Sequence, residues 1–324
     1  MRRGLLLATL AVVLAAAPAA RAEDPPFVGW ASLLPSMAKG FTPSTFDACA
    51  DGAPSCVGRT IARMGERLAR LDARCDHRAL FLRNYLTVTQ HYAQLPQGFF
   101  ADDRFLAHED AVFAQLYFDA FDAHARKRFD EVPEAWRLAF DAARGRQVEG
   151  LGDLLLGINA HVQRDMPFML AGLGLLGPDG RSRKDDHDRF NTVLNASFDD
   201  VYGRATAVDD PRMALYNPYG PLSGALGFQL VAGWREGVWR NAERLARART
   251  RAARQRVARS IERQAAASAQ AILAFFAYRP PASSVEARRA HCRSRPADPG
   301  PGGPPAGLDG RALVRAGDGQ VRRP

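Results

Sequence analysis

Apolar residues recur every three or four positions through most of the chain, which is the spacing of an α-helix that buries one face. The clearest case is the segment from Val57 to Cys75, where the buried-type positions follow one another at intervals of four, three, four, three and four residues. Arginines and acidic residues fall mostly between them. The same spacing predicts two further helices, over about 78–94 and about 103–129.

Beyond residue 130 the pattern predicts more helices, separated by proline- and glycine-rich breaks. The expected elements are a short helix from Pro133, a helix from about Gln147 to Asp165, a Gly-rich connection over 172–180, a helix over 185–208, a loop over 209–224 and a long helical region to about Tyr278. Pro167 is expected to end or kink the helix before it. No sustained alternation of apolar and polar residues indicates strands, so the sequence predicts an all-α fold with a single bundle-like helical domain.

The first 22 residues have the pattern of a secretion signal. Arg2 and Arg3 precede an apolar run, and Ala20-Arg21-Ala22 has the small residues of a cleavage site. The run is shorter than the roughly 20 residues that a membrane-spanning helix needs. We therefore expect a secreted or periplasmic protein that is cleaved near Ala22, and an uncleaved N-terminal anchor is the alternative.

Composition divides the rest of the chain into three parts. Residues 23–54 are rich in Pro and Gly and predict an irregular lead-in, residues 55–279 form the predicted helical domain, and residues 280–324 are a Pro/Gly/Arg-rich tail that we expect to be largely disordered. The formal net charge is +9, and removal of the signal with its three arginines would leave +6. This mild excess is weak evidence for an anionic partner.

Four cysteines suit an oxidising compartment. They allow three pairings, of which we favour Cys49 with Cys56 and Cys75 with Cys292. The first pair would close a short loop, and the second would tether the tail to the helical domain. Free thiols are the alternative. The chain contains no CxxC, which argues against a cysteine zinc site.

A run of polar residues interrupts the strongly apolar helix that precedes Pro167. It reads Gly157-Ile158-Asn159-Ala160-His161-Val162-Gln163-Arg164-Asp165-Met166-Pro167. His161 and Asp165 lie four residues apart and share one helix face. Their burial costs free energy unless each finds a partner or a metal ion. One helix face can supply two ligands to a divalent ion such as zinc or manganese, with further ligands from elsewhere.

Carboxylates also surround a histidine in the segment 184–191. Asp188 and Asn191 lie one turn apart there, and a helical hairpin would bring them near His161. The predicted metal ligands are His161, Asp165 and Asp188, and the candidate groups for proton transfer are His187 and Asp188. In that arrangement the ion would lower the pKa of a bound water, and one of the latter two residues would move protons.

A purely structural role is the alternative. His161 and Asp165 can hydrogen-bond each other, or Asp165 can pair with Arg164 or with Arg83, which lies beside core residues of the second helix. The polar core site would then be a hydrogen-bond network that fixes helix packing. Its members would be Arg83, Asn159, His161, Asp165 and Asn191. The acidic residues at 185–188 would only complement the start of a helix.

Other polar groups have ordinary structural explanations. Glu109 and Asp110 lie in the first turns of a predicted helix, where the helix dipole favours acidic residues. His91 and His124 have polar neighbours and are expected to be exposed. The segment from Arg240 to Arg263 contains nine arginines and would attract nucleic acid or an anionic surface, but a solvated helix face explains it as well. The chain has no P-loop, GxSxG or HExxH motif.

The central segment resembles the bacterial family called domain of unknown function 5995. Gly157 to Asp165 is similar to the G-x-N-A-H-x-x-x-D-L/M-P core of that family, and Asp188-x-Phe190-Asn191 resembles its following acidic-Phe-Asn segment. Trp136 to Phe140 and Trp234 to Leu245 are similar to its flanking helices. The resemblance covers roughly residues 80–250, and it implies an α-helical fold and no established activity.

A more distant similarity is to the zinc-dependent phospholipase C and P1 nuclease group, whose members carry H-x-x-x-D on a core helix with a proline soon after. His161, Asp165 and Pro167 match that fragment, but no H-x-x-x-E follows and the chain has only seven histidines. The sequence therefore favours an exported helical protein with a polar core motif and no established activity. The alternative is a metal-dependent hydrolase of a phosphoester or lipid-type substrate.

Overall fold

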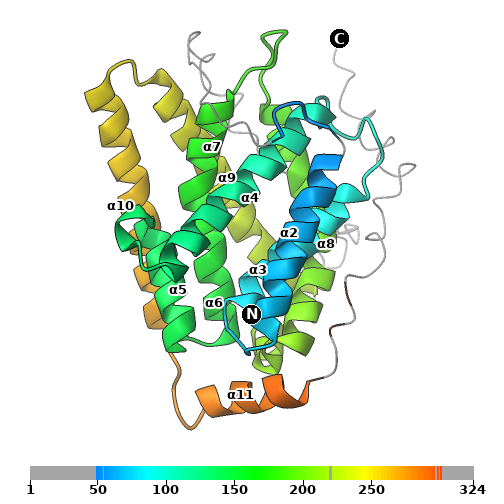
Figure 1. Ribbon diagram of the computed structural model, residues 1–324, viewed down its shortest axis with the longest axis vertical. Coiled ribbons are helices and arrows are strands. Elements are labelled where there is room, and N and C mark those ends of the chain that lie inside the picture. Colours follow the sequence, from blue (N-terminus) through cyan, green and yellow to red (C-terminus); the bar gives the residue numbers. More distant parts are fainter. Residues whose placement is uncertain (1–48, 54, 219–220, 296–297, 299, 301–324) are drawn as a thin grey trace, which may run out of the picture. The chain divides into compact units, whose positions relative to one another are not determined.

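The structure is a computed structural model that describes residues 49–53, 55–218, 221–295, 298 and 300. Within these ranges every regular element is a helix, which confirms the all-α prediction (Figure 1). The predicted signal at 1–22 and nearly all of the lead-in at 23–54 lie outside the described residues, as does most of the tail beyond residue 295. No helix in the described ranges is long and apolar enough to cross a membrane.

Ten α-helices, two 3-10 turns and one π-helix follow one another along the described ranges. They are α2 (Ser55–Asp72), α3 (Ala79–Ala93), α4 (Asp103–Ala125), the 3-10 turn η2 (Phe129–Glu131), α5 (Glu134–Gly145), α6 (Gly150–Ile158), the π-helix η3 (Asn159–Asp165), α7 (Met166–Leu173), α8 (Lys184–Val208), the 3-10 turn η4 (Pro211–Tyr216), α9 (Pro221–Arg247), α10 (Arg251–Phe276) and α11 (Val285–Ser294). The long helical region expected near the C-terminus is two helices, because Thr250 caps a new helix by accepting a hydrogen bond from the Ala253 N–H.

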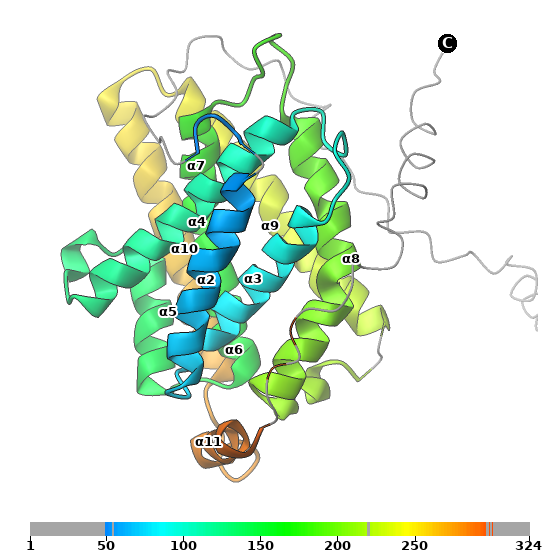
Figure 2. The ribbon, with the colours of Figure 1, turned by 45° about the vertical axis from the view of Figure 1, so that its right-hand side comes forward.

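Two apolar cores lie on either side of η3. The first is built mainly from α2, α3, α4, α5 and α10 around Tyr117 and Trp136. The second is built from α4, α7, α8, α9 and α10 around Met169 and Trp239. Since η3 contacts α5, α9 and α10, the segment that carries the polar motif forms the connection between both cores. Figure 2 shows α2, α3 and α8 in succession across one side of these cores.

The backbone changes from an α-helix to a π-helix just before Pro167. In η3 the Met166 N–H donates to the carbonyl of His161, five residues earlier. Pro167 has no N–H to donate, and its ring would crowd the carbonyl one turn before it in a regular α-helix. The wider turn accommodates the proline, so of the two expected outcomes, an end or a distortion of the helix, the second is observed, and the helix continues as α7 to Leu173.

Gly157 allows the closest approach between α6 and α3. A Cβ atom on Gly157 would lie 2.4 Å from the ring of Phe81, which is buried in the first core. Such a distance is far below van der Waals contact, and the ring is confined by Tyr117 and Trp136 in edge-to-face geometry. The glycine at the start of the polar motif is therefore needed for packing.

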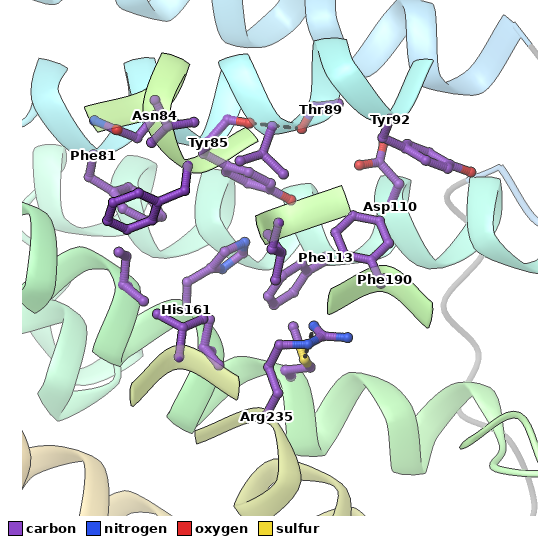
Figure 3. A pocket seen from close by; sticks show the side chains of 18 of the residues that line it. Phe81, Asn84, Tyr85, Thr89, Tyr92, Asp110, Phe113, His161, Phe190 and Arg235 are labelled. Atoms are coloured by element: carbon purple, nitrogen blue, oxygen red, sulfur yellow. Dashed lines mark hydrogen bonds between the residues drawn. The ribbon is translucent and has the colours of Figure 1, made fainter. Parts of the chain in front are cut away.

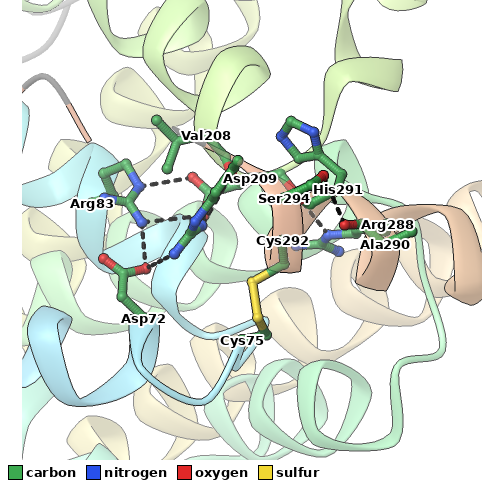
Figure 4. Close-up of a disulfide and its surroundings, with 11 residues drawn as sticks. Asp72, Cys75, Arg83, Val208, Asp209, Arg288, Ala290, His291, Cys292 and Ser294 are labelled. Atoms are coloured by element: carbon green, nitrogen blue, oxygen red, sulfur yellow. Dashed lines mark hydrogen bonds and ion pairs between the residues drawn. A yellow bond between two sulfur atoms is a disulfide. The ribbon is translucent and has the colours of Figure 1, made fainter. Parts of the chain in front are cut away.

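Both predicted disulfides are confirmed. Cys49 pairs with Cys56 and Cys75 pairs with Cys292, with Cα–Cα distances of 5.9 and 6.0 Å. The second bond holds α11, a helix that the sequence analysis did not place within the tail (Figure 4). Ser284 caps this helix by accepting from the Ala287 N–H.

Buried ion pairs lie beneath α11. Arg288 of α11 contacts Asp153 at 2.5 Å and His77 Nδ1 at 3.1 Å. Arg83 contacts Asp209 at 2.9 Å and Asp72 at 2.5 Å (Figure 4). Burial alone would lower the pKa of the Arg83 guanidinium, but these carboxylates and that of Asp298 raise it above the ordinary value. The charges of this region are thus matched within the protein.

We predict opposite effects from two Gly-to-Ala substitutions. Gly157→Ala should lower the free energy of unfolding by about 2 kcal/mol or more, because the new methyl group overlaps the Phe81 ring. Gly65→Ala, in α2 with nothing within 4 Å of its Cβ position, should raise it by about 0.5–1 kcal/mol. Urea denaturation of both variants measures the difference, and equal effects would contradict this packing role of Gly157.

Candidate functional site

The polar motif is bonded almost entirely to other parts of the protein. Asn159 Nδ2 donates to the Ala265 carbonyl of α10 at 2.9 Å, and Gln163 Nε2 donates to Asn159 Oδ1 at 2.7 Å. Both side chains are buried, and the contact joins η3 to the middle of α10. A side chain that satisfies a buried main-chain carbonyl in this way specifies how the helices dock.

Asp165 is the centre of a second set of contacts. Its Oδ2 accepts a hydrogen bond from the indole N–H of Trp136 at 2.7 Å and lies 3.4 Å from His161 Nδ1. Its Oδ1 accepts from Arg164 Nη1 at 2.9 Å. The Asp165 side chain is only 1% exposed, so its charge is balanced by the neighbouring arginine and by two further donors.

Arg83 does not take part in this network. It forms ion pairs with Asp72, the last residue of α2, and with Asp209, which directly follows α8. The alternative contact with Asp165 is therefore not formed. The physical reason is position on the helix: Phe81 faces His161, whereas Arg83 lies two residues further along α3 and leaves by another face.

Two residues of this segment of α8, His187 and Asn191, contact Arg235 of α9. The local sequence pattern did not indicate a role for Arg235. Asn191 Oδ1 accepts from Arg235 Nε at 2.8 Å, and His187 Nδ1 lies 3.3 Å from Arg235 Nη2. Asp188 instead forms an ion pair with Lys184, one turn earlier. Burial and the charges of Arg235 and Lys184 hold the pKa of His187 well below its usual range.

These positions do not fit the predicted metal site. Across the described residues no three or more His, Cys, Asp or Glu side chains form a group that could hold a metal ion. His161, Asp165 and Asp188 therefore do not converge, and both oxygens of Asp165 already have donors from the protein. The residue types were suitable for a zinc or manganese ion, but the packing of η3 and α8 separates them.

A cavity of about 200 Å³, partly open to solvent, lies between α3, α4, α8, α9 and the α6–η3 segment (Figure 3). Its wall is mainly aromatic and aliphatic, and the lining includes Phe81, Tyr85, Val88, Tyr92, Phe113, Val162, Phe190, Leu194, Phe198, Tyr202, Phe228 and Val231. A few polar or charged side chains reach it, among them Glu109, Asp110, His161 and Arg235. In Figure 3 Tyr85 and Asp110 come from one side of the cavity, and Arg235 from the opposite side.

Glu109 and Asp110 are the two carboxyl groups of this cavity. Both are partly buried, and burial raises the pKa of each to about 7. For Glu109 the charges of Arg235 and Arg183 act in the opposite direction, whereas the charge of Glu109 raises the pKa of Asp110 further. The sequence indicated that acidic residues suit the early turns of this helix, but it did not indicate that both residues line a cavity.

His161 connects the polar motif to the cavity. Its ring stacks on Phe113 with centroids 3.5 Å apart and planes at 10°. Burial lowers its pKa, although Asp165 acts to raise it, so the imidazole is neutral near pH 7. Its Nε2 and the hydroxyl of Tyr85 are buried without a hydrogen-bond partner. Both groups are therefore available to a water molecule or to a ligand in the cavity.

Two other expectations about charged residues have different outcomes. His91 and His124 were expected to be exposed, which is wrong: each is 1% exposed, and each lies within hydrogen-bonding distance of an aspartate. In the arginine stripe, Arg240 pairs with Glu236 and Glu243, while Arg256, Arg259 and Arg263 of α10 are exposed. The attraction of nucleic acid or an anionic surface to Arg240–Arg263 stays a prediction.

Residues 57–275 match the sequence model of a family described as a family of unknown function, DUF5995. The match covers more than half of the chain, and the protein belongs to this family. No curated protein and no solved structure matches the chain. These comparisons do not show the similarity to zinc-dependent phospholipase C and P1 nuclease that His161, Asp165 and Pro167 had suggested.

The raised pKa of Asp110 predicts how stability depends on pH. In the unfolded chain an aspartate loses its proton near pH 4, but in the folded protein Asp110 loses it near pH 7. The folded state thus becomes relatively less stable as pH rises from about 4 to 7. Asp110→Asn removes this penalty, so relative to wild type the variant should gain roughly 2–4 kcal/mol between pH 5 and pH 8.

Urea denaturation at both pH values measures this gain. Asp119→Asn is the matched control, because Asp119 lies on the same helix and is exposed. A stability difference between Asp110→Asn and wild type that is the same at pH 5 and pH 8 would show that Asp110 is not an uncompensated buried carboxyl.

Proposed function

We propose that this member of the DUF5995 family is an exported binding protein that holds a small, mostly apolar molecule in the cavity between α3, α4, α8 and α9. The cavity is the observation that carries the proposal. Interiors of folded proteins are close-packed, and voids much larger than a water molecule are few. A space of about 200 Å³ with a mainly aromatic wall is therefore a feature that requires an explanation.

The energetic cost of an empty cavity supports occupation by a ligand. Side chains that line an unfilled apolar space lose dispersion contacts, and where the space is open they leave apolar surface in contact with water. Apolar cavities of about 150 Å³ stay dry and bind molecules of the size of benzene. An apolar molecule that fills the space would recover much of the lost dispersion energy.

The polar motif supports a binding role over a catalytic one. Asn159, Gln163 and Asp165 all have partners within the protein, and their contacts fix η3 against α5 and α10. Because η3 carries His161 and Val162 into the cavity wall, the motif determines the shape of that wall. A metal-dependent hydrolase would need His161, Asp165 and Asp188 around one ion, and these side chains do not form such a group.

Two features support export. Residues 1–22 have the pattern of a secretion signal, and the two disulfides are typical of proteins that fold in an oxidising compartment. A binding protein in the periplasm or outside the cell would meet its ligand there. We place cleavage near Ala22.

Binding of small apolar probes tests the proposal. Indole, toluene and naphthalene should each raise the melting temperature of the mature protein, and at a concentration of about 100 Kd the gain in stability is about 2.7 kcal/mol. Val88→Phe places a phenyl ring in the space beside Tyr85 and Tyr92, and it should abolish binding while leaving the protein folded.

Leu230→Phe is the matched control, because Leu230 is 46% exposed on α9 and does not line the cavity. This variant should bind the probes as wild type does. If Val88→Phe and Leu230→Phe bind equally well, the probes occupy another site, and if wild type binds none of them, the proposed function is wrong.

A further inference from the structure

We infer that the natural ligand of the cavity is an organic cation, an apolar body that carries one positive charge, and that Asp110 holds this charge. This inference rests on the proposed binding function and adds the chemical class of the ligand. It follows from the arrangement of charges and aromatic rings at one end of the cavity.

Asp110 is the carboxyl group of the cavity for which the described part of the chain supplies no counter-charge. It forms no ion pair with any described residue, and its Oδ2 is buried without a hydrogen-bond partner. The Thr60 hydroxyl hydrogen-bonds to the carboxyl group and is the one polar neighbour that favours its ionised form. An isolated carboxylate in an apolar site is costly, and a bound cation would remove that cost.

The arginines near the cavity act on the pKa of Glu109 and not on that of Asp110. Arg235 and Arg183 face Glu109, and their charges lower its pKa against the effect of burial. Arg235 donates to neutral acceptors, namely the side chain of Asn191 and the carbonyl of His187. Asp186 accepts from the backbone N–H groups of Ala101 and Asp102. With Glu109 opposed by the arginines, Asp110 is the excess negative charge.

Aromatic side chains line the cavity together with Asp110. They include Tyr85, Tyr92 and Phe113, and Phe113 follows Asp110 by three residues on the same face of α4 (Figure 3). Burial and the charge of Asp110 both raise the pKa values of the two tyrosines, so their hydroxyl groups lie within electrostatic reach of this carboxyl group. Aromatic faces attract cations, and such rings with a carboxylate are the usual site for an ammonium group.

His161 adds a further feature of the same kind. It is 3% exposed, neutral and stacked on Phe113. With the ring proton on Nδ1, directed toward Asp165, the unpartnered Nε2 accepts a hydrogen bond and cannot donate one. Asp110 and His161 thus offer acceptors to the cavity, and the hydroxyl of Tyr85 can accept or donate. A carboxylate or phosphate ligand would meet the charge of Asp110 there with like charge.

Three probes with nearly the same body separate charge from shape. They are phenyltrimethylammonium, its neutral isostere tert-butylbenzene, and the anion 4-tert-butylbenzoate. Calorimetric titration of the mature protein at pH 8.5, where Asp110 is ionised, should show that the ammonium binds at least about tenfold more tightly than the neutral isostere, and that the benzoate binds more weakly than both. At pH 5.5 the preference for the ammonium should be lost, because the carboxyl is protonated.

Asp110→Asn should reduce ammonium affinity at pH 8.5 by about tenfold and change that for tert-butylbenzene by less than about twofold. Asp119→Asn, an exposed substitution on the same helix, should change neither. Equal affinity for ammonium and isostere in the wild-type protein, or tighter binding of the benzoate, would overturn the inference while leaving the proposed function standing. Failure of all three probes to bind would overturn both. The pH comparison uses wild type alone, so it decides the matter even if Asp110→Asn does not fold.

Discussion

The contacts of Asp165 are the interaction on which the rest of the site depends. One buried carboxylate joins Trp136 of α5, Arg164 and His161, and it does so from a π-helical turn that connects the two apolar cores. Because a buried charge is tolerated only with its partners in place, this turn has one favourable position relative to α5. The positions of His161 and Val162 in the cavity wall follow from it.

The cavity combines two properties that seldom occur together. Its wall is mainly apolar, yet Glu109 and Asp110 bring ionisable groups to it and both titrate near pH 7. A fold selected only for stability would fill such a space and replace the acids with apolar residues. The protein instead retains them beside Tyr85, Tyr92 and Phe113. This arrangement is best understood as a site that is complete only with its ligand.

The helical spacing of apolar residues predicted most of the fold. The same spacing could not predict the site, because its contacts join residues that are far apart in the sequence. The helices around Val57–Cys75 and 185–208 were recognisable because one face is apolar. The pairing of Cys75 with Cys292 followed from the small number of alternatives. In contrast, Arg83 and Asp209 are 126 residues apart, and nothing local indicates their contact. Glu109 and Asp110 fit the acidic early turns of a helix, and only the packing of α4 among its neighbouring helices reveals that they line a cavity.

The central claim is that this cavity exists in solution and accepts apolar guests. Diffraction from a crystal of the protein held under xenon pressure tests it most directly, since xenon enters dry apolar cavities without needing any particular polar contact. The account predicts xenon between Phe113, Val88 and Phe198, with little movement of the surrounding helices. A space closed by these side chains, with no xenon in it, would contradict the account.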